Sequence, residues 1–158
     1  MKSLFPFSVI AACVVVVGFG VSAQTMDGHG MTTPQELKWG PAPPGLPPNA
    51  QAAVLLGDPG KAGVYVVRLK ASKGYFIPPH THPTQEVVTV ISGTMRVGLG
   101  NAANRDQTKA LPAGGLFVAE PGHVHYVYVD EETVIQANGV GPFVINYVNP
   151  SDDPRGKK

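Results

Sequence analysis

The distribution of apolar residues from residue 51 onward is that of short β-strands. Apolar runs are separated by stretches of glycine, proline, asparagine and aspartate, which tolerate the backbone angles of tight turns. No segment keeps the 3.6-residue period of an amphipathic helix. The pattern predicts strands at Ala52–Leu56, Val64–Lys70, Glu86–Ile91, Thr94–Leu99, Leu116–Ala119, His123–Val129, Thr133–Ala137 and Phe143–Val148.

Turns are predicted between these strands, and one of them consists of Asn138 and Gly139. Many short strands with regular turns indicate an all-β sandwich or barrel. A jelly roll is the version that closes most of its strand edges. The sequence therefore predicts an all-β jelly-roll barrel over residues 51–149, followed by a polar tail at residues 150–158.

The first 23 residues have the layout of a secretory signal peptide. Lys2 supplies a positive start, Val9–Val17 is an unbroken apolar run, and Val21–Ala23 has the small residues of a signal peptidase site. The apolar run is too short for a comfortable transmembrane helix. We therefore expect cleavage before Gln24 and an exported protein, periplasmic or extracellular, with no stable membrane insertion.

Cys13 offers an alternative to this cleavage. The residues before it resemble a lipoprotein box, which would leave the cysteine lipid-modified, but the apolar run continues past it. Cys13 is also the only cysteine of the chain, so the cleaved protein forms no internal disulfide. About 100 residues of strand-rich sequence can bury a sufficient core without one.

Residues 24–50 form a segment rich in proline and glycine ahead of the barrel. Proline fixes φ and lacks an N–H, so residues 40–48 are predicted to run extended over the surface. Trp39 is interpreted as a packing anchor, with a ligand-stacking platform as the alternative. Thioether and imidazole groups lie close to Gln24, on Met26, His29 and Met31. Soft thioethers favour Cu(I), so one interpretation of these residues is a copper site, and the other is a flexible tail in which they have no role.

The charge balance argues against nucleic acid as a partner. The chain has 12 Lys and Arg against 11 Asp and Glu, and loss of Lys2 with the leader leaves 11 against 11. A protein that neutralises phosphates needs a basic face, which this composition does not provide.

Two histidines and a glutamate precede or begin the third predicted strand. His80, His82 and Glu86 are two and four residues apart, so they share one face if a single strand runs through them. Val88 and Val90 continue that face as core. Polar groups carried into a core cost stability unless something satisfies them. Two imidazoles and a carboxylate form, in outline, a site for a divalent metal such as Fe(II), with open coordination positions.

The two histidines belong to a longer frame of fixed spacings. Its residues, separated by five, one, three and six positions, are Gly74, His80, His82, Glu86 and Gly93. At average glycine and histidine usage, chance agreement in one short chain is on the order of 1 in 10,000. The frame matches, at every position, the first motif of the cupin superfamily.

The second cupin motif is matched in part. Gly114, Gly122 and His125 stand at its glycine and histidine positions. Glu120 replaces its proline, however, and Val129 replaces its asparagine. The chain thus resembles small exported single-domain cupins of the type-2 conserved-barrel kind over residues 51–148. The resemblance implies a double-stranded β-helix, which is a jelly-roll barrel.

The resemblance also implies a metal site. Its ligands by position are His80, His82, Glu86 and His125, which would hold one divalent transition metal (Fe, Mn, Ni, Cu or Zn) and leave two positions open. His123 has the parity of His125 and is a further ligand, an orienting neighbour or a solvent-facing turn residue. Candidates for orienting the liganding rings are Gln85, Arg96 and Tyr126.

Two classes of function follow from the resemblance. One is a metal-dependent, dioxygenase-like enzyme of the cell envelope, an oxygenase, lyase or isomerase acting on a small organic or sugar-like substrate. The other is a non-catalytic module that binds a metal or a small ligand. A homodimer is expected. Tyr126 and Tyr128 have the opposite parity to His125, so we expect them in outer-face packing or at the dimer interface.

Overall fold

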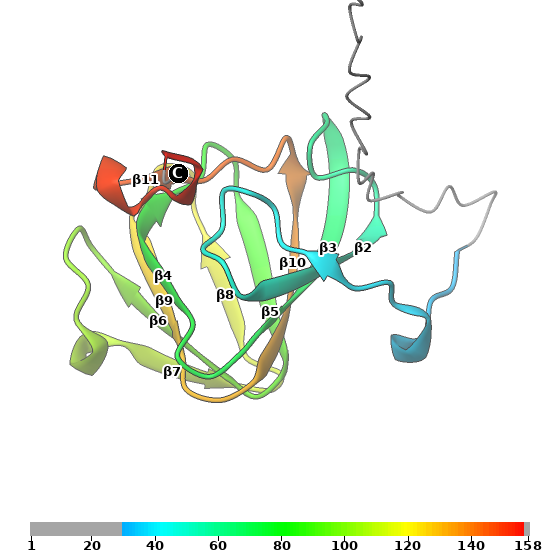
Figure 1. Cartoon of the computed structure of the whole chain (residues 1–158), viewed down its shortest axis with the longest axis horizontal. Coiled ribbons are helices and arrows are strands. Elements are labelled where there is room, and N and C mark those ends of the chain that lie inside the picture. The colour runs from blue at the N-terminus through cyan, green and yellow to red at the C-terminus, as the bar shows by residue number, and fades with distance from the viewer. Residues whose placement is uncertain (1–29, 157–158) are drawn as a thin grey trace, which may run out of the picture.

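The computed structural model describes residues 30–156 as two facing antiparallel sheets, which confirms the all-β jelly-roll prediction (Figure 1). One sheet has six strands in the order β1-β2-β3-β10-β5-β8, and the other has five in the order β11-β4-β9-β6-β7. The strands are β1 Gly40–Pro41, β2 Ala50–Leu56, β3 Gly63–Ala71, β4 Phe76–Thr81, β5 Glu86–Ser92, β6 Thr94–Leu99, β7 Lys109–Pro112, β8 Leu116–Ala119, β9 His125–Val129, β10 Thr133–Gly141 and β11 Asn146–Tyr147. The 3-10 helices are η1 Pro34–Glu36, η2 Arg105–Gln107, η3 Pro150–Asp152 and η4 Pro154–Gly156.

Several predictions for the N-terminus concern residues that the structure does not describe. The expected leader at residues 1–23, with Cys13, lies outside residues 30–156, as do Met26 and His29. Met31 is described and is exposed. Within residues 30–156, no helix has the length and apolar character needed to cross a membrane.

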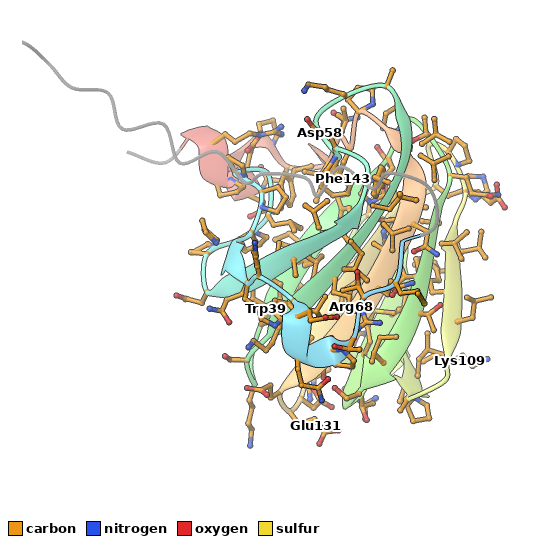
Figure 2. The ribbon with its side chains drawn as sticks, turned by 90° about the vertical axis from the view of Figure 1, so that its right-hand side faces the viewer. Trp39, Asp58, Arg68, Lys109, Glu131 and Phe143 are labelled. Atoms are coloured by element: carbon orange, nitrogen blue, oxygen red, sulfur yellow. The ribbon has the colours of Figure 1, made fainter. Side chains whose placement is uncertain are left out.

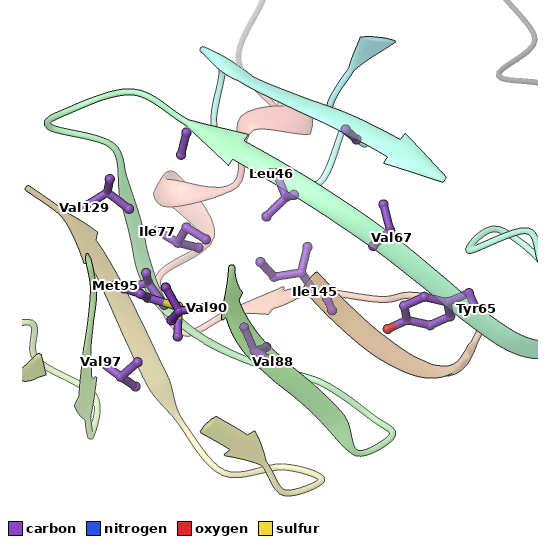
Figure 3. Close-up of a cluster of buried hydrophobic side chains, with 14 residues drawn as sticks. Leu46, Tyr65, Val67, Ile77, Val88, Val90, Met95, Val97, Val129 and Ile145 are labelled. Atoms are coloured by element: carbon purple, nitrogen blue, oxygen red, sulfur yellow. The ribbon is translucent and has the colours of Figure 1, made fainter. Parts of the chain in front are cut away.

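The core lies between the two sheets and is built from alternate residues of each strand. In β3, for example, Tyr65 and Val67 are buried between the sheets, whereas Val64 is exposed on the outer face. β-Branched and aromatic side chains pack well on such a pleated surface, which is why these runs form strands. The buried cluster (Figure 3) comprises Leu46, Ala52, Tyr65, Val67, Ala71, Ile77, Val88, Val90, Met95, Val97, Val127, Val129, Ala137 and Ile145.

Asn138 and Gly139 lie inside strand β10, so the prediction of a turn at this position is wrong. Gly139 pairs with Tyr65 on one side and with Glu86 on the other. A Cβ atom at position 139 would lie 2.5 Å from Tyr65 Oη, so only glycine lets the buried ring lie across the strand here. The glycine therefore marks a close approach between a side chain and the backbone.

His80, His82 and Glu86 are not on one strand, so the assumption of a shared strand face is also wrong. His80 lies in β4 of the five-stranded sheet, Glu86 begins β5 of the six-stranded sheet, and His82 lies in the connection between them. Strand β4 is missing from the prediction because it contains Pro78 and Pro79. Both prolines lie where the register with β9 shifts, and there the ladder of hydrogen bonds is already irregular.

Trp39 and strand β1 lie along the edge of the six-stranded sheet. β1 pairs with β2 as an edge strand, a position in which proline is tolerated. Trp39, which is labelled in Figure 2, is partly buried. The Nζ atom of Lys70 lies 4.7 Å from the centroid of its ring. This cation–π contact holds the start of the proline-rich segment on the outer side of the sheet.

The rest of the proline-rich segment is fixed to the barrel by its own buried contacts. Leu46 belongs to the hydrophobic core. Tyr75 Oη donates a hydrogen bond to the Pro47 carbonyl (2.9 Å), and Tyr147 Oη donates one to the Gly45 carbonyl (2.8 Å). Residues 45–47 are therefore part of the packed structure and not a free linker.

Candidate metal centre

Three histidines converge at one end of the space between the sheets. His80 is in β4 and His125 is the first residue of β9, and the register of these strands places the two residues opposite each other. His82 follows β4. The three rings are almost wholly buried, with exposed fractions of 2%, 4% and 3% for His80, His82 and His125. Each offers one ring nitrogen, and these nitrogens all lie within 4.8 Å of one another.

The other nitrogen of each ring is hydrogen-bonded to a backbone carbonyl. The Nδ1 atoms of His80, His125 and His82 lie 2.7, 3.2 and 2.8 Å from the carbonyl oxygens of Pro78, His123 and Val144. A carbonyl oxygen only accepts, so each ring carries its proton on Nδ1 and presents the lone pair of Nε2. This is the arrangement that orients imidazoles toward a metal.

His82 Nε2 shows directly that the site fits a metal. This atom is buried and has no hydrogen-bond partner among the described residues. A buried polar atom without a partner is costly, because it has lost water and gained nothing in exchange. A divalent transition metal, for which neutral imidazole is a preferred ligand, would satisfy it together with the neighbouring nitrogens.

Burial keeps the imidazoles of His80 and His125 neutral. It lowers the pKa of His80 to about 2, an effect that the neighbouring His125 reinforces. It likewise lowers the pKa of His125 to about 4. Neutral rings are the form that binds metals, so no proton has to leave these two histidines at neutral pH before a metal binds.

Glu86 lies on the flank of this cluster, on the facing sheet. Its Oε2 atom is 3.5 Å from His82 Nε2, and 8% of the residue is exposed. Burial raises the pKa of the Glu86 carboxyl, and the neighbouring His82 opposes the rise. The compact group of ligand atoms thus consists of three imidazoles, with one carboxylate beside it.

The remaining predicted site residues lie further out. His123 is exposed in the turn before β9 and approaches the centre only through its carbonyl. The side chains that were candidates for orienting the rings have partners elsewhere. Gln85 donates to Glu120 (3.0 Å), Arg96 donates to Asp130 (2.5 Å), and Tyr126 Oη donates to the Asn104 carbonyl (3.0 Å).

Two phenylalanines contact the histidines and were not singled out from the sequence. The Phe143 ring centroid lies 5.4 Å from that of His82, and the Phe117 centroid lies 5.1 Å from that of His125. Phe117 has the parity of the buried Ala119 in β8, which is a signal that could have revealed it. Phe143 lies in an irregular segment after β10, where no such signal exists.

The histidines open onto a small cavity in the barrel. Its volume is about 30 Å³, which is room for about two waters. The walls are mostly apolar, and they include Phe117, Phe143, Leu46 and Ile145 beside the histidines and Glu86.

An antiparallel β-barrel that buries three imidazoles at one end offers a site that could hold a transition metal. The family model described as Cupin matches residues 59–138 of this chain. The protein belongs to the cupin family, and the resemblance noted from its two motifs is confirmed.

Among curated proteins, the chain is similar to "Germin-like protein subfamily 2 member 1" of Arabidopsis thaliana. The two are 35% identical over 108 residues, which cover 63% of this chain and 49% of the relative. The chain thus spans about half the length of this curated relative.

Two solved structures share the fold at low sequence identity. The polyketide cyclase RemF of Streptomyces resistomycificus matches with a TM-score of 0.64 and 19% identity, over 80% of this chain and 90% of that one. The DMSP lyase DddQ of Ruegeria pomeroyi matches with a TM-score of 0.57 and 16% identity, over 72% and 62%. At such identities these matches support the barrel and not a reaction.

Proposed function

We propose that this cupin is a metal-dependent enzyme of the cell envelope that acts on a small molecule through one divalent transition metal. The observation that carries the proposal is the set of three Nε2 atoms that converge while each Nδ1 is held by a carbonyl. His80, His82 and His125 would hold the metal, with Glu86 as the carboxylate ligand. When bound, such a metal supplies Lewis acidity or redox chemistry at its open positions.

The residues of the chain have three tasks in this proposal. The carbonyls of Pro78, His123 and Val144 fix the ring protons on Nδ1. The apolar walls exclude bulk water, which strengthens electrostatic interactions within the site. Glu86, whose pKa burial raises, can hold a proton on its carboxyl at a higher pH than a free glutamate can while no metal is bound, and it would release that proton on becoming a ligand.

The cell-envelope location rests on the sequence of the N-terminus. Lys2, the apolar run Val9–Val17 and the small residues Val21–Ala23 support export. Cell fractionation with a tag after Lys158 tests this part: we expect tagged protein in the periplasm or medium and an N-terminus at Gln24. A tagged chain that keeps Met1 and stays in the cytoplasm would contradict it.

Metal content is the first test of the proposal. Protein recovered from its own compartment should contain about one equivalent of a transition metal by elemental analysis. The double variant His80→Ala/His125→Ala should contain almost none, because two of three imidazoles are gone. His123→Ala is the matched control and should keep the metal, since its side chain is exposed and only its carbonyl faces the centre. Wild-type protein that stays metal-free after reloading would refute the proposal.

A non-catalytic binding module is the second candidate, and the small cavity favours it. About 30 Å³ beside the histidines leaves no space for a sugar unless the walls move. Loaded protein incubated with a panel of small organic acids and sugars, followed by NMR and by an oxygen electrode, separates the two functions. Turnover that disappears in Glu86→Gln supports the enzyme, and a loaded protein that converts nothing supports the module.

A further inference from the structure

Phe117 and Phe143 cover the histidine triad from two sides. Phe117 extends inward from β8, the edge strand of the six-stranded sheet, and lies over His125. Phe143 lies over His82 and comes from the segment that leads from β10 to β11. Figure 2 shows Phe143 close to Asp58, near the end of the molecule where the β2–β3 loop lies.

These two rings stand between solvent and the cavity. At the histidine end of the cavity, the histidines, Glu86 and the apolar residues Leu46 and Ile145 are buried. Four lining residues are partly exposed, namely Leu69, Phe117, Ile135 and Phe143. Of these, Phe117 and Phe143 are the ones whose rings pack against the histidine rings. A molecule that enters from outside and reaches the Nε2 atoms therefore passes along these phenyl rings.

Both rings are held in place by packing. Phe143 meets Tyr65 edge to face, with centroids 6.2 Å apart at 81°, and its backbone N–H donates to the Pro59 carbonyl at 2.6 Å. Phe117 pairs directly with Val88 across the β5–β8 ladder. Side chains packed against a core and a regular ladder do not swing aside at low cost. The width of the passage is therefore fixed by the ring positions seen here.

We propose that Phe117 and Phe143 form a size filter, which admits ligands of two or three atoms to the triad and excludes ligands that contain a ring. The inference rests on the proposed metal site and narrows the ligand class for that site. A cavity of about 30 Å³ holds about two waters, and a linear triatomic anion has a comparable size. A five-membered ring needs space that the two phenyl groups occupy.

Ligand titrations of the cobalt(II)-loaded protein test the filter. Azide is the small probe and imidazole is the ring-containing probe, and binding is read from the visible absorption bands of cobalt. Wild type should bind azide and should show at least a tenfold weaker response to imidazole. Phe143→Ala and Phe117→Ala should each strengthen imidazole binding at least tenfold and leave azide binding within about threefold. Phe76→Ala is the matched control, because Phe76 stacks on Tyr128 away from the triad.

The possible outcomes separate the filter from the proposed metal site. Cobalt that binds at one equivalent, with imidazole as tight as azide in the wild type, would overturn the filter and leave the metal site intact. A wild type that takes up no cobalt would overturn both. Should an alanine variant fail to fold by circular dichroism, Phe143→Leu keeps an apolar side chain of smaller reach. Its imidazole affinity should still exceed that of the wild type, and an unchanged affinity would also refute the filter.

Discussion

At the scale of single residues, two of the three histidines are oriented by the same local hydrogen bond. His80 and His125 each hydrogen-bond through Nδ1 to the carbonyl two residues earlier in the chain, at Pro78 and His123. The ring direction is thus set by the backbone of the residue pair itself. His82 differs, because its acceptor at Val144 lies 62 residues away.

The depressed pKa values make the metal-free protein sensitive to acid. His80 and His125 titrate near 6.5 when unfolded but near 2 and 4 when folded, so below pH 6.5 the unfolded chain binds protons that the folded chain does not. Stability is full above pH 6.5 and falls as pH drops toward 4, by about 1.4 kcal/mol per pH unit for each proton. Urea unfolding of metal-free protein from pH 7.5 to 4.5 measures this slope, and a flat profile would contradict it.

Glu86 acts in the opposite direction as pH rises above 4.5. Its folded pKa is raised above 4.5, so the folded carboxyl keeps a proton that the unfolded one loses, and its contribution to stability falls as pH rises. Glu86→Gln removes this opposing contribution to the pH dependence of stability, because glutamine does not titrate. We expect the metal-free variant to be more stable than wild type at pH 7.5 and to lose stability more steeply on acidification. Equal slopes for the two proteins would show that Glu86 is not desolvated as described.

At the scale of elements, the pairing of β6 with β9 depends on a glycine, because the ring of Tyr126 in β9 lies directly against Gly98 in β6. Tyr126 is fully buried, and its Oη is tied to the Asn104 carbonyl in the loop before η2. A Cβ atom at Gly98, its partner in the ladder, would lie 2.1 Å from Cζ of that ring. Tyr126 was expected either in outer-face packing or at a dimer interface. The structure shows it packed on the outer face of its sheet, beneath the loop that contains Asn104.

Gly98→Ala should therefore destabilise the protein by about 1–3 kcal/mol, since the fixed ring cannot move away from the added methyl group. Gly40→Ala is the matched control, because nothing lies within 4 Å of a Cβ there. We expect its change to stay within about 0.5 kcal/mol. Thermal and urea unfolding measure both, and equal effects of the two substitutions would show that the Gly98 contact is not close.

The proline-rich segment contributes to the core through Leu46. Leu46→Ala should cost about 2–5 kcal/mol, because the buried side chain lines the cavity and its loss enlarges it. Leu99→Ala, at an exposed position, should change stability by less than about 0.5 kcal/mol. If unfolding experiments give Leu46→Ala the same small effect, the segment does not pack on the barrel in solution.

The comparison of predicted and observed elements shows what local sequence encodes. Strands with alternating or continuous apolar residues, such as β3 and β6, match their predictions closely. Strand β4 was not predicted because it contains two prolines. Strands β1 and β7 were not predicted because they are too short or too polar to show the two-residue period of a strand. The segment Phe143–Val148 contains only the two-residue strand β11, since its first half crosses between the sheets.

The liganding side chains of the site could be predicted from the sequence, but the groups that orient them could not. His80 and His82 match the first cupin motif and His125 stands at the histidine position of the partly matched second motif, so the three histidines could be named without a structure. The geometry of the site comes from two sheets that face each other. The spacing of residues along a single strand does not predict how two sheets face each other. The orienting groups are backbone carbonyls, which every residue has and which no composition or spacing reveals.

At the scale of the whole molecule, the outer face of the six-stranded sheet exposes several large apolar side chains. Its strands β3, β5, β8 and β10 expose Val64, Ile91, Leu116, Val118 and Val140. The free face of an antiparallel sheet is normally polar, and exposed apolar patches mark interaction sites. We expect the homodimer that the resemblance implies to form through this face.

Light scattering after size-exclusion chromatography tests this expectation. Wild type should have the mass of a dimer, and Leu116→Lys should shift it to the monomer, because a charge buried in an apolar interface is desolvated without a partner. Leu99→Lys, exposed on the other sheet, should remain dimeric. A monomeric wild type, or a Leu116→Lys variant that stays dimeric, would rule out this interface.

The hydrogen bond from His82 to the Val144 carbonyl would determine when during folding a metal could bind at the proposed site. Val144 belongs to the last part of the barrel to be synthesised, and the His82 ring has no fixed direction until this segment has crossed from one sheet to the other. At the proposed metal site, a chain that has formed only the earlier strands would have two oriented imidazoles and would bind metal weakly. Full occupancy would then require a complete barrel, so the ion would stabilise the product of folding and would not nucleate it.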